Sequence, residues 1–277
     1  MLAAVLALSA SFTWGSSNFL AGLESRRRSV WITTAVSQVV AALSAGLVLL
    51  VAGQPSPDLW HTVGPILGGV AGAIGIVAFY QALAIGTMSV VSPIIALQVV
   101  VPVAVGLLLG ERPDMRAYLG MVLAVAGVAV VSWSNGRSSD RAHRSAILLA
   151  MITAVCFGIM LVGLNVGGRE SPYWAVFDAR LASMGVILVY FAASRRRFDL
   201  TGRDVPVLAC VGLLLTVSNI LFTVATTLGY LSIVSILGSL SPMVTTVYAQ
   251  IILGERLTAR QWIGVATVFT GVFLLSV

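Results

Sequence analysis

The sequence predicts an all-α integral membrane protein of ten transmembrane helices, arranged as two inverted five-helix repeats. Three observations support this fold class. First, 58% of the 277 residues are hydrophobic and only 9% are charged, whereas about a quarter of the residues in a soluble domain are charged. Second, the apolar runs are long enough to cross a hydrocarbon layer of about 30 Å. Third, one short motif occurs twice, about half a chain apart.

The repeated motif is Gly-Glu-Arg, which follows one apolar run and precedes the next. It occurs as Gly110-Glu111-Arg112 and as Gly254-Glu255-Arg256, 144 residues apart. With a slip of one residue, an offset of 143 also aligns Trp14-Gly15 with Phe157-Gly158. Further matches at this offset are Trp31 with Trp174, Gly69 with Gly212, and Phe79 with Phe222. The chain is therefore an internal duplication, which decides the architecture.

We expect the first repeat at residues 1–134, a polar connecting loop at 135–145, and the second repeat at 146–277. Turn residues between the apolar runs delimit the helices. The expected helices are 2–22, 30–52, 63–85, 88–109, 115–133, 146–167, 173–193, 205–227, 232–253 and 258–277. Because five helices per repeat is an odd number, the second repeat enters the membrane from the opposite side. Transporters built from inverted repeats bind substrate near the midplane, between the halves.

The arginines indicate an orientation. All sixteen basic residues are arginine, and twelve of them lie in the loops after the first, fifth, seventh and ninth helices. These twelve are Arg26, Arg27, Arg28, Arg137, Arg141, Arg144, Arg195, Arg196, Arg197, Arg203, Arg256 and Arg260. The opposite side holds Arg112, Arg116 and Arg169. The positive-inside rule places the twelve in the cytoplasm and both termini outside. The net charge of +6 is thus explained by the bilayer, and no nucleic acid partner is expected.

No metal or cofactor is expected. The two cysteines, Cys156 and Cys210, fall inside apolar runs and lack the spacing of metal ligands. Both are interpreted as small packing residues. Met1 leads directly into the first apolar run without a charged segment, so we expect no removable signal peptide.

Polar and aromatic side chains deep inside the predicted helices are the candidates for binding a solute. Asp178 is the only one of ten acids well inside a helix, and Arg180 follows two residues later. Two residues turn side chains about 200° apart around a helix, so this pair cannot face one point. The candidate substrate-binding residues are Trp14, Asn18, Tyr80, Gln81, Gln98, Asp178, Arg180, Asn219, Thr223, Ser239 and Tyr248. Each could instead bond to a neighbouring helix, at about 0.6 kcal/mol.

Prolines and the Gly-Glu-Arg turns form a second group, with gating or structural roles. Pro93 and Pro102 are expected to kink the helix at 88–109, and Pro242 the helix at 232–253. In each turn, Glu111-Arg112 and Glu255-Arg256, the glutamate is expected to accept from N–H groups opening the next helix. The arginine is expected to cap carbonyls that end the previous helix.

These features together resemble the EamA-type transporters of the drug/metabolite transporter superfamily. The resemblance covers essentially the whole chain: an aromatic-Gly pair in the first and sixth helices, a serine-rich start with proline in the fourth and ninth, and Leu-Gly-Glu-Arg endings. It implies ten helices in two inverted repeats, with alternating access around a central cavity lined by helices one to four and six to nine. It also implies small metabolites as substrates, often amino acids, commonly exported across the bacterial inner membrane.

Three features depart from the family pattern. The arginine usual in the second and seventh helices appears only as Arg180, with Ser37 at the matching position in the first half. Gln98 replaces the first-half proline, and Pro102 follows one turn later. The arginine count favours termini outside, whereas family members usually keep them inside. The first helix also lacks the carboxylate with which related small multidrug antiporters bind protons, so a neutral or zwitterionic solute is favoured over a lipophilic cation.

The sequence thus favours a secondary transporter of a small polar or zwitterionic, amino-acid-like metabolite, acting as an exporter. Asp178 is the candidate carrier if a proton is the coupling ion, and a monomer or weak homodimer is expected. Two other classes stay open: a lipid scramblase or receptor-like membrane protein, and an intramembrane enzyme. The enzyme is less supported, because the sequence holds no HExxH or GxSxG motif and His61 and His143 lie in loop regions.

Overall fold

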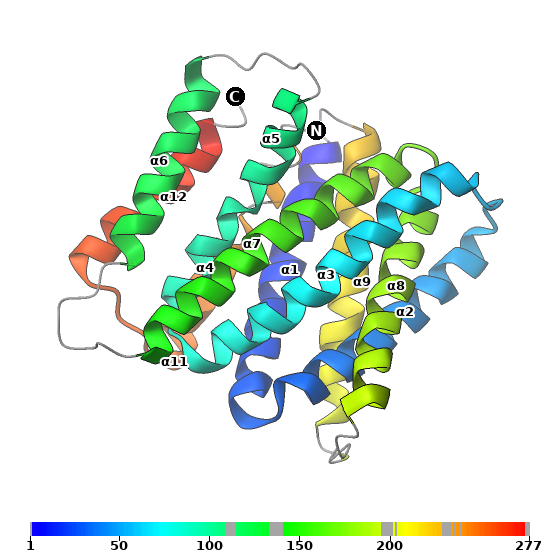
Figure 1. Cartoon of the computed structure of the whole chain (residues 1–277), viewed down its shortest axis with the longest axis horizontal. Coiled ribbons are helices and arrows are strands. Elements are labelled where there is room, and N and C mark those ends of the chain that lie inside the picture. The colour runs from blue at the N-terminus through cyan, green and yellow to red at the C-terminus, as the bar shows by residue number, and fades with distance from the viewer. Residues whose placement is uncertain are drawn as a thin grey trace.

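The structure is a computed structural model that describes residues 2–108, 115–132, 141–194, 202, 204–228, 234, 237–238 and 240–274. Within these ranges, all regular elements are helices (Figure 1). They are α1 (Leu2–Arg27), α2 (Val30–Ala52), α3 (Leu59–Ile85), α4 (Met88–Ile95), η1 (Ala96–Val99), α5 (Val100–Leu108), α6 (Met115–Ser132), α7 (Arg141–Gly168), α8 (Pro172–Ser194), α9 (Val205–Leu228), α11 (Ser241–Leu253) and α12 (Ala259–Leu274).

Five of the described helices are long and apolar enough to cross a membrane. They are Val30–Ala52, Leu59–Ile85, Ala142–Gly168, Pro172–Ala193 and Val205–Leu228. Their burial pattern fits lipid as the solvent. On α2, for example, Ala41 and Ala45 are buried, whereas Leu43 and Leu47 are 68% and 63% exposed. Small residues inside and large aliphatic residues outside allow close helix packing in a bilayer.

The helix predicted at 88–109, with expected kinks at Pro93 and Pro102, is interrupted in the structure. A 3₁₀ turn, η1 at Ala96–Val99, separates α4 from α5. Pro102 has no N–H to donate to the carbonyl of Gln98, which interrupts the regular α-helical pattern. Pro242, expected to kink the helix at 232–253, lies in the first turn of α11, which begins at Ser241. A proline there costs little, since its missing N–H would have no partner inside the helix.

Hydrogen bonds and ion pairs at the helix termini define two ends of the bundle. At one, which we call the Arg26 end, α1, α3 and α11 end and α4 begins, joined through Arg26 and Glu255. At the other, the Gln54 end, α2 ends and α8 begins, joined by a 2.6 Å bond from Ser171 Oγ to Gln54 Oε1. α7 begins at the Arg26 end, where His143 lies in the same surface hollow as Arg26, and Glu170, just past its end, pairs with His61.

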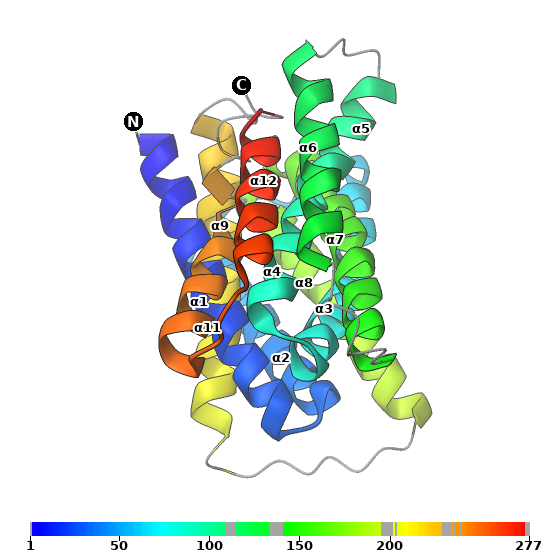
Figure 2. The same ribbon diagram turned by 90° about the vertical axis from the view of Figure 1, so that its left-hand side faces the viewer.

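Helices that correspond at the offset of 143 therefore run in opposite directions. α1 leads to the Arg26 end, whereas its counterpart α7 leads away from it (Figures 1 and 2). Figure 2 shows both labelled termini at the same end of the bundle. This is the direction that an inverted repeat requires. The full count of ten spans, which includes residues outside the described ranges, stays a prediction.

The two halves interlock. α3 packs against α7 and α8, and the corresponding helix α9 packs against α1 and α2. α6 and α12, the last helices of each half, pack against each other at one side (Figure 1). The hydrophobic core that results draws on both halves, and it includes the largest fully buried aromatic side chains, Tyr80, Phe79 and Phe222.

Two glycines mark equivalent close approaches between helices. A Cβ atom placed on Gly15 would lie 2.5 Å from Cβ of Val244, and one on Gly158 would lie 2.5 Å from Cβ of Val101. Gly158 follows Gly15 by 143 positions, and Val101 precedes Val244 by 143 positions. The absence of a side chain at Gly15 and Gly158 is thus what lets α1 meet α11 and α7 meet α5. The sequence offset is preserved in three-dimensional packing.

Candidate functional site

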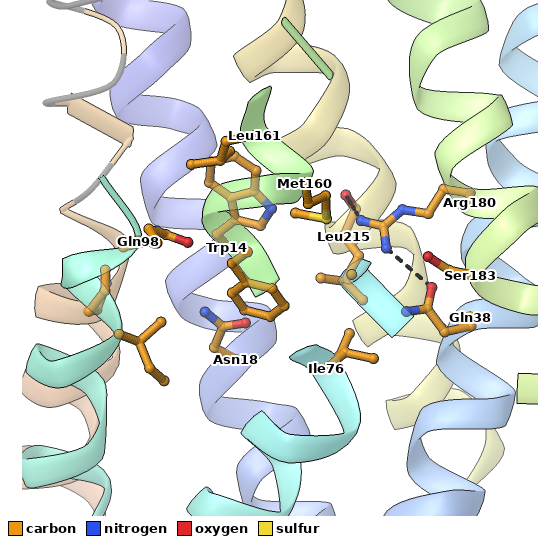
Figure 3. A pocket seen from close by; sticks show the side chains of 15 residues that line it. Trp14, Asn18, Gln38, Ile76, Gln98, Met160, Leu161, Arg180, Ser183 and Leu215 are labelled. Atoms are coloured by element: carbon orange, nitrogen blue, oxygen red, sulfur yellow. Dashed lines mark hydrogen bonds between the residues drawn. The ribbon is translucent and has the colours of Figure 1, made fainter. Parts of the chain in front are cut away.

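A cavity lies where the two halves meet (Figure 3). The empty space in it is about 610 Å³, including its opening to solvent. The lining is mostly apolar with a few polar groups. It consists of Trp14, Asn18, Gln38, Gly72, Ile76, Ile95, Gln98, Phe157, Met160, Leu161, Arg180, Ser183, Leu215, Ser241 and Pro242.

Equivalent positions of the two repeats line this cavity. Four pairs of its lining residues stand 143 positions apart: Trp14 with Phe157, Asn18 with Leu161, Gly72 with Leu215, and Gln98 with Ser241. Three of the pairs differ in chemistry; for example, the amides Asn18 and Gln98 correspond to a leucine and a serine in the second half. The duplicated backbone therefore encloses a cavity whose polar groups are distributed asymmetrically.

Trp14, which lines the cavity, is hydrogen-bonded to a second candidate residue, Asn219. The indole Nε1 of Trp14 donates to Oδ1 of Asn219 at 2.9 Å. The Trp14 ring also packs on Phe222, with 5.3 Å between ring centroids. Asn219 is 1% exposed, and its Nδ2 has no partner. One turn later, the hydroxyl of Thr223 donates to the carbonyl of Asn219, so Thr223 supports this turn and does not line the cavity.

Arg180 reaches the cavity from α8, and Gln38 meets it from α2 (Figure 3). Nη1 of Arg180 donates to Oε1 of Gln38 at 3.1 Å, and Nη2 donates to the carbonyl of Leu215 at 3.2 Å. Ser183, one turn after Arg180 on α8, donates to the carbonyl of Gly69 at 2.6 Å. Sequence reasoning missed Gln38, although an amide in the middle of an apolar helix is the same signal that selected Gln98.

The broken helix positions Gln98. Because η1 replaces α-helical geometry at Ala96–Val99, Gln98 lies at the cavity. Gln98 is 8% exposed. Pro242 lies at the cavity too, at the start of α11. The lining therefore includes a helix interruption from the first half and a helix N-terminus from the second, which fits the pattern of discontinuous helices at transporter sites. Pro93 is buried within α4, away from this lining.

Several candidate residues lie elsewhere. Gln81 is exposed, since it is turned by about 100° from its buried neighbour Tyr80. Tyr80 is completely buried beside the cavity, and its hydroxyl has no hydrogen-bond partner. Asp178 is half-buried on a different face of α8 from Arg180, with Oδ2 unpartnered. Ser239, Glu111 and Arg112 lie outside the described residues.

Tyr248 joins α11 to α1 and does not line the cavity. Its hydroxyl lies 3.3 Å from Oγ of Ser16. Its ring packs against Phe19, with 5.4 Å between centroids, and edge-on against Phe12. Thr245 on the same helix donates to the carbonyl of Gly15 at 3.1 Å. These contacts fix the position of α11 against the cavity wall.

Glu255 closes the Arg26 end, but not in the way the sequence predicted. It accepts from the backbone N–H groups of Met88 and Ser89 at 3.2 and 2.9 Å, so it caps α4, a helix of the other half. The next helix, α12, is capped by its own residues. Thr258 and Gln261 form a reciprocal cap, in which each side chain accepts from the backbone N–H of the other residue.

Capping of helix-ending carbonyls, the role predicted for the motif arginine Arg256, is performed at this end by Arg26. Arg256 is exposed, whereas Arg26 donates to the carbonyls of Leu83 and Gly86 that end α3, at 2.9 and 2.8 Å. Arg26 also forms a 3.1 Å ion pair with Glu255. The cap and the ion pair together join the ends of α1, α3 and α11 to the start of α4.

The described residues include no group of three or more His, Cys, Asp or Glu side chains placed to hold a metal ion. The cavity offers one guanidinium, the amides of Asn18, Gln38 and Gln98, an indole and the hydroxyls of Ser183 and Ser241, in a wall that is mostly apolar. Such a site can orient a small polar molecule by hydrogen bonds and enclose its apolar part.

A model of the EamA-like transporter family matches residues 1–133 and 144–277. One solved structure, described only as "Crystal structure of protein", is similar with a TM-score of 0.70 over 99% of this chain and 97% of that chain. At 14% identity this likeness concerns the fold alone. No curated protein matches the sequence. Because the family model matches both halves, the chain belongs to the EamA-like transporter family and is a multi-pass membrane transporter.

Proposed function

We propose that this transporter moves a small polar or zwitterionic, amino-acid-like metabolite by alternating access, and that it exports this solute across the bacterial inner membrane. The observation that carries the proposal is the cavity lined by equivalent positions of both halves. A solute held there contacts both repeats at once. Rocking one repeat against the other would then expose the same site to one side of the membrane and afterwards to the other.

The contacts at the Arg26 end supply an element that such a motion must break. Glu255 and Arg26 join helices of both halves there through four hydrogen bonds to backbone groups and one ion pair. Opening this end requires that α11 separates from α4 and α1. We infer that formation and loss of these bonds accompany the two access states.

Asp178 is our proposed proton carrier if transport is coupled to protons. Its carboxyl group is half-buried within a membrane-spanning helix, with one oxygen lacking a partner. A carboxylate in this setting is costly and marks functional positions. Because Asp178 does not line the cavity, it would act on the protein conformation and not by direct contact with the solute. A fused pair of repeats forms the whole cavity, so we propose a functional monomer.

The test is solute transport by the purified protein in liposomes. Amino acids, nucleosides, sugars and amines are first screened by thermal shift, because a bound solute raises the free energy of unfolding by RT ln(1 + [L]/Kd). Each stabilising solute is then measured in counterflow. Solute-dependent counterflow supports the proposal, whereas stabilisation without flux would indicate a receptor-like protein.

A matched pair of variants ties the flux to the cavity. Ile76 lines the cavity and is 4% exposed, whereas Ile74 on the same helix is 53% exposed. Ile76→Trp fills the cavity and is expected to abolish counterflow, while Ile74→Trp adds the same bulk on the lipid side and should leave it unchanged. Both variants are compared at equal amounts of folded protein. Equal flux in the two variants would place the transport route elsewhere.

A further inference from the structure

The cavity contains a buried positive charge to which the described residues supply no carboxylate partner. Arg180 is 4% exposed and lines the cavity. Its guanidinium has five N–H donors, and the structure gives it two acceptors, the amide of Gln38 and the carbonyl of Leu215. Nε has no hydrogen-bond partner. Both acceptors are neutral, so neither balances the charge.

Three contacts between oppositely charged groups lie at the two ends of the bundle, away from Arg180. They are the ion pairs of Arg26 with Glu255 and of Arg28 with Asp204, and the contact of His61 with Glu170, which is an ion pair when the histidine is protonated. Asp178, two residues before Arg180, is not among the residues that line the cavity. A buried charge in a membrane protein is stabilised by a partner of opposite charge or marks a substrate pathway. The solute is therefore the candidate for the negatively charged partner of Arg180.

We propose that Arg180 holds a carboxylate of the transported solute. This inference rests on the proposed function and narrows its substrate class to small carboxylic acids, including amino acids. The planar fork of an arginine matches a carboxylate with two parallel hydrogen bonds. Gln38 fixes the orientation of that fork by accepting from Nη1, and it is thus a positioning residue.

The remaining lining supports a carboxylate over other groups. Among the described residues, no acidic side chain lines the cavity, so a solute whose only charge is an ammonium group has no ionised partner in that part of the lining. A phosphate dianion would call for a second cation, whereas Arg180 is the only cationic side chain that the described part of the chain contributes to the lining. Ile76, Met160, Phe157 and Leu161 form an apolar wall that can enclose a short aliphatic or aromatic tail.

Matched solutes test this on the unmodified protein. Four compounds share one scaffold and differ in charge: propanoate, alanine, propanamide and propylamine. A second set carries a phenyl group: 3-phenylpropanoate, phenylalanine, 3-phenylpropanamide and 3-phenylpropylamine. Affinity is measured by isothermal titration, with phosphate as a further probe. In at least one set, the acid and the amino acid are expected to bind at least tenfold more tightly than the amide and the amine.

Variants then assign the preference to Arg180. Arg180→Met keeps the length and removes the charge, so acid and amide should bind with similar affinity. Arg180→Lys keeps the charge without the fork and should restore part of the preference. Arg169→Met, at an exposed position at the Gln54 end, is the control and should keep the full preference. If Arg180→Met does not fold, the affinities of acids, amides and amines for the unmodified protein still test whether the cavity prefers a carboxylate.

Four results would overturn the inference. They are an amide or amine that binds as tightly as its acid in both sets, phosphate that binds more tightly than every acid, an acid preference that survives Arg180→Met, and the absence of binding in both sets. The proposed function fails separately, through the absence of counterflow for every solute screened. If a neutral solute shows counterflow and Ile76→Trp abolishes it, the proposed transport function stands, and the proposal that Arg180 binds a carboxylate fails.

Discussion

Glu255 and Arg26, 229 positions apart in the sequence, form a 3.1 Å ion pair that joins the second half of the chain to the first. Glu255 also caps α4 through the N–H groups of Met88 and Ser89, and Arg26 caps the end of α3. A carboxylate at a helix N-terminus and a cation at a C-terminus both complement the helix dipole. One residue pair thus satisfies two helix ends and closes one end of the bundle.

Removal of the Glu255 charge should loosen this end. Glu255→Gln keeps one amide oxygen as acceptor but loses the ion pair and half of the cap. The free energy of unfolding is expected to fall by about 1 kcal/mol, because helix caps contribute about 0.5–2 kcal/mol. Thermal unfolding in detergent measures this change.

The control for this prediction is Asp58→Asn. Asp58 precedes α3, and its side chain makes no capping hydrogen bond, so stability should not change. A double-mutant cycle with Arg26→Gln separates the ion pair from the cap. If Glu255→Gln destabilises no more than Asp58→Asn, the contacts at the Arg26 end do not hold the helices together.

Close helix contacts make a second prediction. Gly158→Ala should destabilise by about 1–3 kcal/mol, since a Cβ would lie 2.5 Å from Cβ of Val101 and 2.6 Å from the carbonyl of Gln98. Gly185→Ala in α8 has open space around it. It should be neutral or stabilising by up to about 1 kcal/mol, because alanine favours helix. The melting temperatures of the two variants test this prediction. Equal values would contradict the claim that close helix packing requires glycine at position 158.

How much of this was readable from the sequence depends on the kind of interaction. Gly15 and Gly158 were found through the duplication, because close backbone contact requires the same residue in both halves. Trp14 and Arg180 were found because polar and aromatic groups are rare inside apolar helices. Glu255 was found as a cap but assigned to the wrong helix, since sequence shows adjacency along the chain and not which distant helix N-terminus lies nearby. Gln38 became meaningful only once Arg180 was seen beside it.

The bond between Trp14 and Asn219 makes a third prediction. Trp14→Phe keeps a ring against Phe222 but removes the Nε1 donor to Oδ1 of Asn219. An unsatisfied buried amide costs about 1 kcal/mol or more, so solute affinity or flux should fall about fivefold. Trp262→Phe, at a position 49% exposed, is the matched control. Unchanged transport in both variants would show that this bond does not shape the cavity.

Asp178 makes a fourth prediction, on coupling. Asp178→Asn keeps the shape of the side chain and removes the titrating group. Because Asp178 does not line the cavity, exchange of solute at equal concentrations should continue at the original rate. Accumulation driven by an imposed proton gradient should be lost. Uphill transport that persists in the variant would end the assignment of Asp178 as proton carrier.

The relative direction of the two halves makes the last prediction. In a background without the free cysteines Cys156 and Cys210, single cysteines replace Arg112 and Arg256, equivalent residues of the repeated motif. Inverted repeats place these two on opposite sides of the membrane. A membrane-impermeant maleimide should therefore label Arg112→Cys from outside intact cells and Arg256→Cys only after lysis, as the arginine count requires. The reverse pattern would keep the inversion and change the orientation, whereas labelling of both from one side would contradict the inverted repeat, and with it the cavity formed between two opposed halves.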